Sequence, residues 1–504
     1  MIDHETSMLA TLVDDVEPFR TALPTEPILS KRPPERLQSL IDFGAVDRLL
    51  SDHALRYPFI EMIKDGARLP RERFLTGPVG QPNGISELAN LTLVAGELEG
   101  GATLVLNDLH FTWRPIADTC RRLAYEIGMP VHANAYLTPR RSQGFDHHHD
   151  THSVFIVQTE GRKTWQLYRP FLPFPLERHA WPRQVLPPEE WHRLRETPPD
   201  HEFVLEPGNV LWIPRGWIHN VFSGDEPSLH LTVGIAETSR YSIVPTLIDA
   251  LTDEERFRHD LPPRFARSRG SVEDAVRSVL RDLAEWAGRA DVSELATRVL
   301  GAQRARFLPA PSRPISAVLP GDRDLPGAVA VRPEVIAGVD RTDEGTTLHL
   351  GDRVLRFTGT AAAVLERLLG ASGKRVTLGA LTAAEPAAAV EAAVRTLLAE
   401  GVLVPDDDAF AEVSTSSEVR ARAEASTPAE GSARAERSVR AEESTSPEGS
   451  ARAERGARAE RSGVAAGNAP ADGKALLEGA PLLGGASVPD GGACTGEARE
   501  RAAR

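Results

Sequence analysis

Cysteine is almost absent from this sequence: among 504 residues, only Cys120 and Cys494 occur. Two cysteines so far apart cannot build a disulfide framework or supply the four thiolates of a structural zinc site. The N-terminal segment 1–15 is acidic and has no apolar stretch, so we expect no secretory signal. Low cysteine usage of this kind is typical of a reducing compartment, and we expect a cytoplasmic protein.

Long hydrophobic runs and an excess of positive charge are also missing. No segment approaches the roughly 18 consecutive apolar residues that a membrane-spanning helix needs, so we expect no membrane partner. The formal net charge is -14, which argues against direct binding of nucleic acid through a generally basic surface. The hydrophobic fraction of 41% is sufficient for folded cores, and the length predicts about three domains.

Short β-rich runs separated by turn residues dominate from residue 102 to about residue 235. A single helix is expected among them, at 116–128, and residues 1 to about 90 mix short helical patterns with Pro-rich joints. Many short strands between turns favour a sandwich or jelly roll over a parallel sheet. The expected strands are TLVLNDL (103–109), SVFIVQ (153–158), KTWQLY (163–168), VLWIP (210–214) and SLHLTVGI (228–235).

The pattern changes after Thr238. Ser271 and Asp274 predict the start of an amphipathic helix, and a second helix is expected at 292–304. Residues 325–405 have the order of a small α+β module: a hairpin, two helices and a final short strand. Beyond this module, 410–504 is rich in Ala, Arg, Glu, Ser and Gly, and we expect a disordered tail because it cannot bury enough apolar surface.

The segment QGFDHHHDTHSVFIVQTEGRKTW (143–165) contains the pattern His148-x-Asp150. On a strand, residues two apart lie on the same face, so this imidazole and this carboxylate can bind one ion. His219 follows a second strand and a Gly turn in IPRGWIHN. Two histidines and one carboxylate leave coordination positions open, as in non-haem Fe(II) oxygenases. A surface histidine cluster that collects metal adventitiously is the alternative, because short motifs also match by chance.

The ordered surroundings of these residues resemble the ribosomal oxygenase branch of the JmjC/cupin superfamily. The resemblance covers about 20–310, and 325–405 at the level of architecture only. It implies a mostly β catalytic core, a double-stranded β-helix of the cupin/JmjC jelly-roll type. The matching segments are GATLVLNDLH (101–110), NAYLTP (134–139), QGF (143–145), VFIVQTEGRKTWQLY (154–168), EPGNVLWIPRGWIHN (206–220), SLHLTVG (228–234) and LPPRFA (261–266).

The same resemblance implies a domain organisation. The oxygenase domain would span 1–240, with its core at about 92–238. A helical dimerisation region at 241–310, a winged-helix-like module at 325–408 and the disordered tail at 410–504 would follow it. The expected assembly is therefore a homodimer.

The resemblance also implies the cofactors and the residues that bind them. His148, Asp150 and His219 would be the catalytic ligands of Fe(II), and Lys163 would pair with the far carboxylate of the co-substrate 2-oxoglutarate. The remaining residues implied for the co-substrate pocket are Asn134, Tyr136, Ser228 and His230. His147 and His149 depart from the family, which commonly has Pro and an aromatic residue there. On a regular strand they would point away from the metal, whereas His152 would face the same way as the ligands.

The activity implied is 2-oxoglutarate-dependent hydroxylation of a side chain in a protein substrate, with a ribosomal protein as the first candidate. Several alternatives stay open on the sequence: a small metabolite or biosynthetic peptide as substrate, a zinc or manganese cupin that is not an oxygenase, and a non-catalytic binding module. Trp165, Trp212 and Trp217 are expected to be packing residues.

Overall fold

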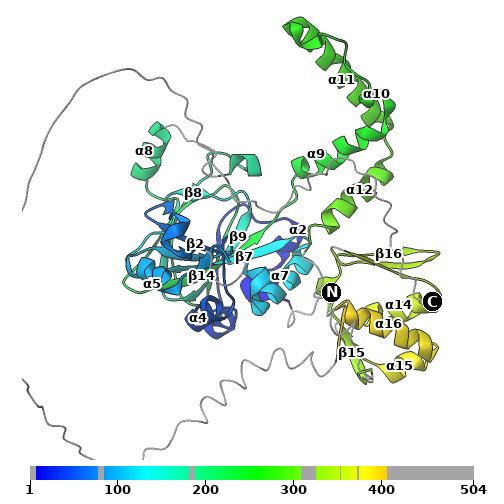
Figure 1. Ribbon diagram of the computed structural model, residues 1–504, viewed down its shortest axis with the longest axis horizontal. Coiled ribbons are helices and arrows are strands. Elements are labelled where there is room, and N and C mark those ends of the chain that lie inside the picture. The colour runs from blue at the N-terminus through cyan, green and yellow to red at the C-terminus, as the bar shows by residue number, and fades with distance from the viewer. Residues whose placement is uncertain are drawn as a thin grey trace, which may run out of the picture. The chain divides into compact units, whose positions relative to one another are not determined.

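The computed structural model describes residues 7–77, 85–180, 188–307, 325–351, 353–371 and 374–405. The expected tail at 410–504 lies outside these residues. The strands of the N-terminal part pair antiparallel throughout and form two main sheets, of eight and four strands (Figure 1). The expected short strands are present, and together they produce the layered β architecture that the jelly-roll prediction requires.

The eight-stranded sheet has the order β1-β12-β9-β14-β7-β6-β2-β3, and the four-stranded sheet has the order β11-β10-β13-β8. The bounds of the large sheet are β1 (Ile28–Lys31), β2 (Ile60–Lys64), β3 (Ala67–Arg68), β6 (Thr103–Leu106), β7 (Val131–Thr138), β9 (Ser153–Glu160), β12 (Asn209–Ile213) and β14 (Ser228–Ile235). Those of the small sheet are β8 (His148–His149), β10 (Lys163–Tyr168), β11 (His201–Leu205) and β13 (Ile218–Ser223). A separate pair comprises β4 (Leu75–Thr76) and β5 (Leu88–Ala89).

Strand periodicity divides the residues of the large sheet between two environments. Phe155 and Val157 of β9 belong to the largest hydrophobic core, whereas Val154 and Ile156 belong to a second core that includes Trp165 and other residues of the small sheet. Because alternate side chains point to opposite faces, one face of the large sheet packs against helices and the other faces the small sheet. The polar residues of β7 and β14 lie on this second face.

The first core is completed by helices that precede and interrupt the sheet. The longest is α7 (Arg114–Ile127), which begins with Pro115 in its first turn and ends at Gly128 in the left-handed conformation. Both features are favourable helix boundaries, and they agree with the helix expected at 116–128. The other helices are α1 (Leu9–Leu12), α2 (Glu17–Thr21), α3 (Pro34–Gln38), α4 (Phe43–Asp52), α5 (Leu91–Glu99), α6 (Leu109–Thr112) and, between β10 and β11, α8 (Pro188–Glu196).

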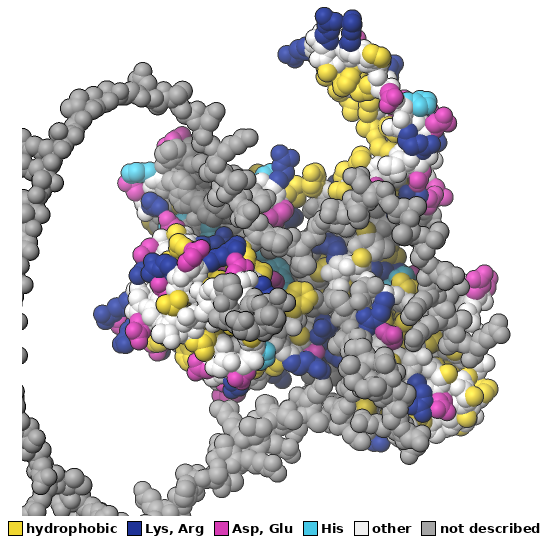
Figure 2. Space-filling view, in the orientation of Figure 1, with side chains coloured by type: hydrophobic (Ala, Val, Ile, Leu, Met, Phe, Trp, Pro, Cys, Tyr) yellow, Lys and Arg dark blue, Asp and Glu magenta, His cyan; other side chains and the backbone are white. Residues whose placement is uncertain are grey.

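Four helices follow β14: α9 (Arg240–Asp249), α10 (Glu255–Arg258), α11 (Arg269–Arg289) and α12 (Val292–Arg304). The prediction that Ser271 starts the helix was wrong by a few residues. Ser268 is the N-cap, because its side chain accepts the backbone N–H of Ser271. None of these four helices has a buried residue, and Figure 2 shows hydrophobic side chains gathered along the segment that contains α10 and α11.

Residues 325–405 form a compact α+β module with its own hydrophobic core. Its helices near 360–370 and 385–400 are present, and so are the hairpin and the last strand. Strands β15, β16 and β19 and the short helix α15 were not predicted. The elements are β15 (Ala328–Val331), β16 (Gly338–Thr342), β17 (Gly345–His349), β18 (Val354–Phe357), α14 (Gly359–Gly370), β19 (Arg375–Thr377), α15 (Leu378–Thr382), α16 (Ala387–Ala399) and β20 (Leu403–Pro405).

None of the helices in the described ranges is both long and apolar enough to cross a membrane.

Candidate metal centre and co-substrate pocket

Two histidines expected in the metal centre lie on neighbouring strands. His148 of β8 pairs directly with His219 of β13, and their ring centroids are 4.2 Å apart. In each ring, Nδ1 lies within hydrogen-bond distance of a backbone carbonyl: 2.8 Å to the oxygen of Asp146 for His148, and 3.2 Å to that of Trp217 for His219. A carbonyl only accepts, so Nδ1 carries the proton in both rings and Nε2 keeps its lone pair for a metal.

Asp150, the third expected ligand, lies close to His219. Its Oδ2 atom is 4.0 Å from Nε2 of His219. Its backbone carbonyl accepts the backbone N–H of Gly216 at 2.9 Å, which ties the residue after β8 to the turn before β13. Metal–nitrogen and metal–oxygen bonds of about 2.1 Å allow two ligand atoms of one ion to lie up to about 4.2 Å apart. Asp150 and His219 therefore lie within reach of one ion. Over the described residues, no group of three or more His, Cys, Asp or Glu side chains is arranged so that it could hold a metal ion.

The electrostatics of these residues suit a divalent cation. Burial, and then the neighbouring His148, lower the pKa of His219 to about 3, so its ring is neutral at physiological pH. Burial alone would raise the pKa of Asp150, but the electrostatic influence of the neighbouring His152, His219 and His148 outweighs it, and the pKa is lowered. The site thus combines a neutral imidazole with an ionised carboxylate, which are the protonation states that metal ligands need.

Lys163 lies in the space between the two sheets. It is only 4% exposed; its Nζ donates to Oγ1 of Thr138 at 2.8 Å and lies 3.5 Å from Nδ1 of His230. Burial lowers its pKa to about 7. No carboxylate pairs with this ammonium among the residues the structure describes, so an anionic ligand would relieve the cost of burying its charge.

The other expected pocket residues lie on β7 and β14, which are paired. His230 is opposite Tyr136, and their rings stack at a centroid distance of 5.0 Å and an angle of 6°. Asn134 lies two residues before Tyr136, and its Oδ1 accepts the backbone N–H of Asp108 at 2.9 Å. The Ser228 hydroxyl is fully buried and accepts from Nε2 of Gln158 at 2.8 Å.

Sequence reasoning missed two residues of this pocket. Thr138, the hydrogen-bond partner of Lys163, lies on the same face of β7 as Asn134 and Tyr136, so strand alternation could have identified it. Trp165 was expected only to pack, and it is buried as expected. Its ring also lies between those of His219 (5.7 Å) and His230 (5.3 Å), and its Nε1–H is buried with no hydrogen-bond partner among the described residues.

The neighbouring histidines have contacts of their own. His147 contacts Oδ1 of Asp146 through Nδ1 at 2.9 Å, and its ring lies 5.4 Å from that of Tyr168. Nε2 of His149 lies 3.0 Å from the carbonyl of His179. His152 and His149 both lower the pKa of Asp150, and the ring of His152 is 4.7 Å from that of His132.

Two antiparallel sheets thus face each other, with His148, His219 and Lys163 on the strands of the small sheet. Residues 108–243 match the family model described as a JmjC domain, in agreement with the resemblance.

Individual proteins that are similar to this chain are named ribosomal oxygenases. The chain is 33% identical over 175 residues to ribosomal oxygenase 2 of Rattus norvegicus, covering 32% of this chain and 36% of that protein. It is 37% identical over 150 residues to ribosomal oxygenase 1 of Homo sapiens, covering 28% of this chain and 22% of that protein. The resemblance to ribosomal oxygenases is confirmed, and the chain spans about a third or less of the length of these relatives. The crystal structure of the Escherichia coli ribosomal oxygenase YcfD aligns with 78% of this chain and 98% of that one, at 16% identity and a TM-score of 0.44.

Proposed function

We propose that this protein is an Fe(II)- and 2-oxoglutarate-dependent oxygenase that hydroxylates a side chain of a protein substrate. The observation that carries the proposal is the presence of two features between the same two sheets. The rings of His148 and His219 are neighbours, and the Asp150 carboxylate lies 4.0 Å from His219. The buried Lys163 ammonium lies near Thr138 and His230 and has no carboxylate partner among the described residues.

The donor set fits Fe(II). Two imidazole nitrogens and one carboxylate oxygen would hold the ion and leave positions for a bidentate 2-oxo acid and dioxygen. When bound, Fe(II) and 2-oxoglutarate supply the oxidising chemistry that adds one oxygen atom to a substrate C–H bond, with release of succinate and carbon dioxide. The residues of the chain bind and position the metal, the co-substrate and the substrate.

Each pocket residue has a role in that positioning. Lys163 would hold the far carboxylate of 2-oxoglutarate, and Thr138 orients the Lys163 Nζ by accepting its hydrogen bond. The stacked Tyr136 and His230 rings, with Trp165 edge-on to His230, would form the walls and exclude water. The unpartnered Trp165 Nε1–H offers one donor to a ligand. Asn134 and Ser228, which resemble co-substrate residues of the family, already have protein partners.

The relatives suggest the class of substrate. Two are named ribosomal oxygenases, and another, from Drosophila persimilis, is named a bifunctional lysine-specific demethylase and histidyl-hydroxylase. A protein side chain is therefore our first choice, and a ribosomal protein is the first candidate. A small metabolite or a biosynthetic peptide would require the same metal chemistry, so it is an outcome of the test below.

The remaining parts of the chain complete the proposal. We propose that 1–240 is the oxygenase domain, that 241–310 mediates homodimerisation, and that 325–408 is a winged-helix-like module that contacts protein. Apolar side chains of α11 support the dimer, since Val276 and Leu280 are 51% and 59% exposed. We place the protein in the cytoplasm and assign no nucleic-acid partner.

The test is turnover of 2-oxoglutarate by the purified full-length protein with Fe(II), followed by succinate release. Asp150→Ala should remove at least about 99% of the succinate, because the carboxylate ligand is lost. Mass spectrometry of ribosomal and total cell protein incubated with the enzyme should show peptides heavier by one oxygen atom. Metal binding without any 2-oxoglutarate-dependent succinate would instead indicate a zinc or manganese cupin, and the oxygenase proposal would be wrong.

A further inference from the structure

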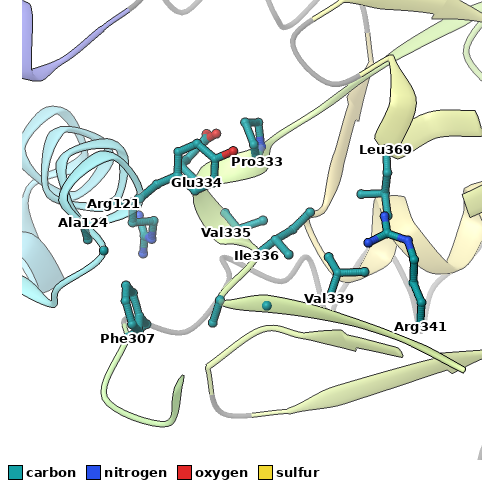
Figure 3. Close-up of a pocket in the computed structure, with 14 residues that line it drawn as sticks. Arg121, Ala124, Phe307, Pro333, Glu334, Val335, Ile336, Val339, Arg341 and Leu369 are labelled. Atoms are coloured by element: carbon teal, nitrogen blue, oxygen red, sulfur yellow. The ribbon is translucent and has the colours of Figure 1, made fainter. Parts of the chain in front are cut away.

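A cavity of about 400 Å³ lies away from the metal centre, between helix α7 and the start of the C-terminal module (Figure 3). Its size is within the range of small-molecule sites. One wall is the end of α7, and the opposite wall is η5 (Pro333–Val335) with the beginning of β16. Most of the lining is apolar, from Ala124, Phe307, Val335, Ile336, Val339 and Leu369.

The charged residues of the lining differ in how well they are paired. Arg341 donates from Nε to both carboxylate oxygens of Glu366, at 3.0 and 3.1 Å. Glu334 accepts from Nε of Arg332 at 3.1 Å. Arg121 has only a long contact from Nη1 to Oδ1 of Asp118, at 3.4 Å, and its Nε is buried with no partner among the described residues. In Figure 3 the Arg121 side chain extends from α7 toward Phe307.

Asp118 cannot fully neutralise Arg121, because its carboxylate also accepts hydrogen bonds from other arginines. Its Oδ1 also accepts from Nη2 of Arg332 at 3.2 Å, and its Oδ2 accepts from Arg114. The two oxygens of Asp118 are therefore divided among three guanidiniums, those of Arg114, Arg121 and Arg332. Burial, and repulsion from Arg332 and Arg114, lower the pKa of Arg121 even though Asp118 opposes this.

We propose that this cavity binds a small amphipathic monocarboxylate, with its carboxylate on Arg121 and its apolar body against Phe307, Ile336 and Val339. A guanidinium matches a carboxylate in geometry, and Nε of Arg121 has no partner among the described residues. In a mostly apolar cavity, a singly charged carboxylate costs less to bury than a doubly charged phosphate. The apolar walls account for the rest of the ligand. Such a ligand would contact both α7 and β16 and so join the JmjC domain to the module that follows it.

The test is calorimetric titration of the full-length protein with octanoate, compared with 1-octanol and octylamine as neutral and cationic probes of the same chain length. Octanoate should bind saturably and at least about tenfold more tightly than either. Charge-assisted hydrogen bonds are strong, so Arg121→Met should weaken octanoate about tenfold to a hundredfold, or ~1.4–2.8 kcal/mol.

Two further variants make the test selective. Arg121→Lys keeps the charge and should retain most of the affinity, whereas Arg356→Met, an exposed arginine of β18, should change nothing. Turnover of 2-oxoglutarate by Arg121→Met should be unchanged, because Arg121 contacts no residue of the metal centre. Equal affinity for octanoate and octanol in the wild-type protein would overturn the proposal even if a variant failed to fold, and so would unchanged octanoate affinity in a folded Arg121→Met protein.

Discussion

Lys163 is a charged side chain in a place that disfavours charge. It is buried between two sheets, and its partners in the structure are a threonine hydroxyl and a histidine ring. Burial lowers the pKa of this lysine to about 7 and lowers that of His230 well below its usual value. A neutral His230 can therefore lie next to the ammonium without repelling it, and the ammonium is kept available for an anion.

Replacing Lys163 should affect the co-substrate more than the metal. Lys163→Met should raise the KM for 2-oxoglutarate about a hundredfold, since removing one partner of a buried charge pair costs about 2–5 kcal/mol. The measurement is succinate formation over a range of 2-oxoglutarate concentrations. Lys374→Met, at an exposed position, is the control and should leave KM unchanged. An unaltered KM in Lys163→Met would remove Lys163 from the pocket.

The lowered pKa of Lys163 also predicts a pH dependence. A carboxylate pairs with the ammonium and not with the neutral amine, so affinity should be highest below the pKa of about 7 and should fall as pH rises above it. Affinity for 2-oxoglutarate should drop up to about tenfold per pH unit from pH 7 to 9.

The control for this pH dependence is Lys163→Arg. Arginine keeps its charge throughout this range, so any 2-oxoglutarate binding that the variant retains should be flat with pH. Equilibrium titration of 2-oxoglutarate at each pH, with the metal present, checks both proteins. The same decline in wild type and Lys163→Arg would show that another group titrates.

At the scale of elements, the period of two along β7 and β14 arranges the site. Leu229, Leu231 and Val233 point into the helix-covered core, while His230 and the residues opposite it face the small sheet. Gly234 continues this strand opposite His132. A Cβ atom at Gly234 would lie 2.4 Å from Cε1 of His132 and 2.8 Å from Cδ2 of His152, so glycine is what allows both rings to lie beside the strand.

Gly234→Ala should therefore force both rings to move. We expect a loss of about 1–3 kcal/mol in the free energy of unfolding, the usual cost of overpacking, and lower turnover because His152 lies two residues from Asp150. Denaturant unfolding and succinate release measure the two effects. Gly224→Ala, where a Cβ atom would meet nothing within 4 Å, should change stability by less than about 0.5 kcal/mol. Equal behaviour of the two variants would contradict the steric argument.

For the whole molecule, the helices after β14 have more apolar surface than their own packing uses. Helix α11 has 21 residues and buries none of them, although Val276, Val279 and Leu280 lie on it and are 51%, 38% and 59% exposed. Most of the stability of a helix in a protein comes from packing of its apolar face. In the homodimer proposal, a second copy of the chain covers this apolar face of α11.

This proposal predicts that a charge on the apolar face dissociates the dimer. Leu280→Glu should weaken self-association at least about tenfold, because burying a leucine is worth about 1.5–3 kcal/mol and a buried carboxylate opposes it. Light scattering coupled to size-exclusion chromatography measures the mass. Arg281→Glu introduces the same side chain at the next position, which is also exposed, and should leave the dimer intact. A wild-type protein that is monomeric at micromolar concentration would refute the proposal.

The sequence alone determined which residues could do the chemistry. Alternation within KTW (163–165) and NAYLT (134–138) is a local property of strands, and the His148-x-Asp150 spacing needs only an extended backbone. The strands, helix α7 and the main elements of the module were accessible for the same reason: their patterns reflect neighbours in the sequence. The start of α11 was misplaced because Ser268 and Ser271 are equally good cap residues.

Only the tertiary structure decided which residues meet. His148 and His219 are 71 positions apart in the sequence and become neighbours through the pairing of β8 with β13. The Lys163–Thr138 hydrogen bond crosses from one sheet to the other, and the second role of Trp165 follows from its place between two histidine rings. The under-paired Arg121 is likewise a product of folding, because its competitor for Asp118 is Arg332, from a distant segment. Such contacts depend on sheet order and packing, which no local pattern encodes.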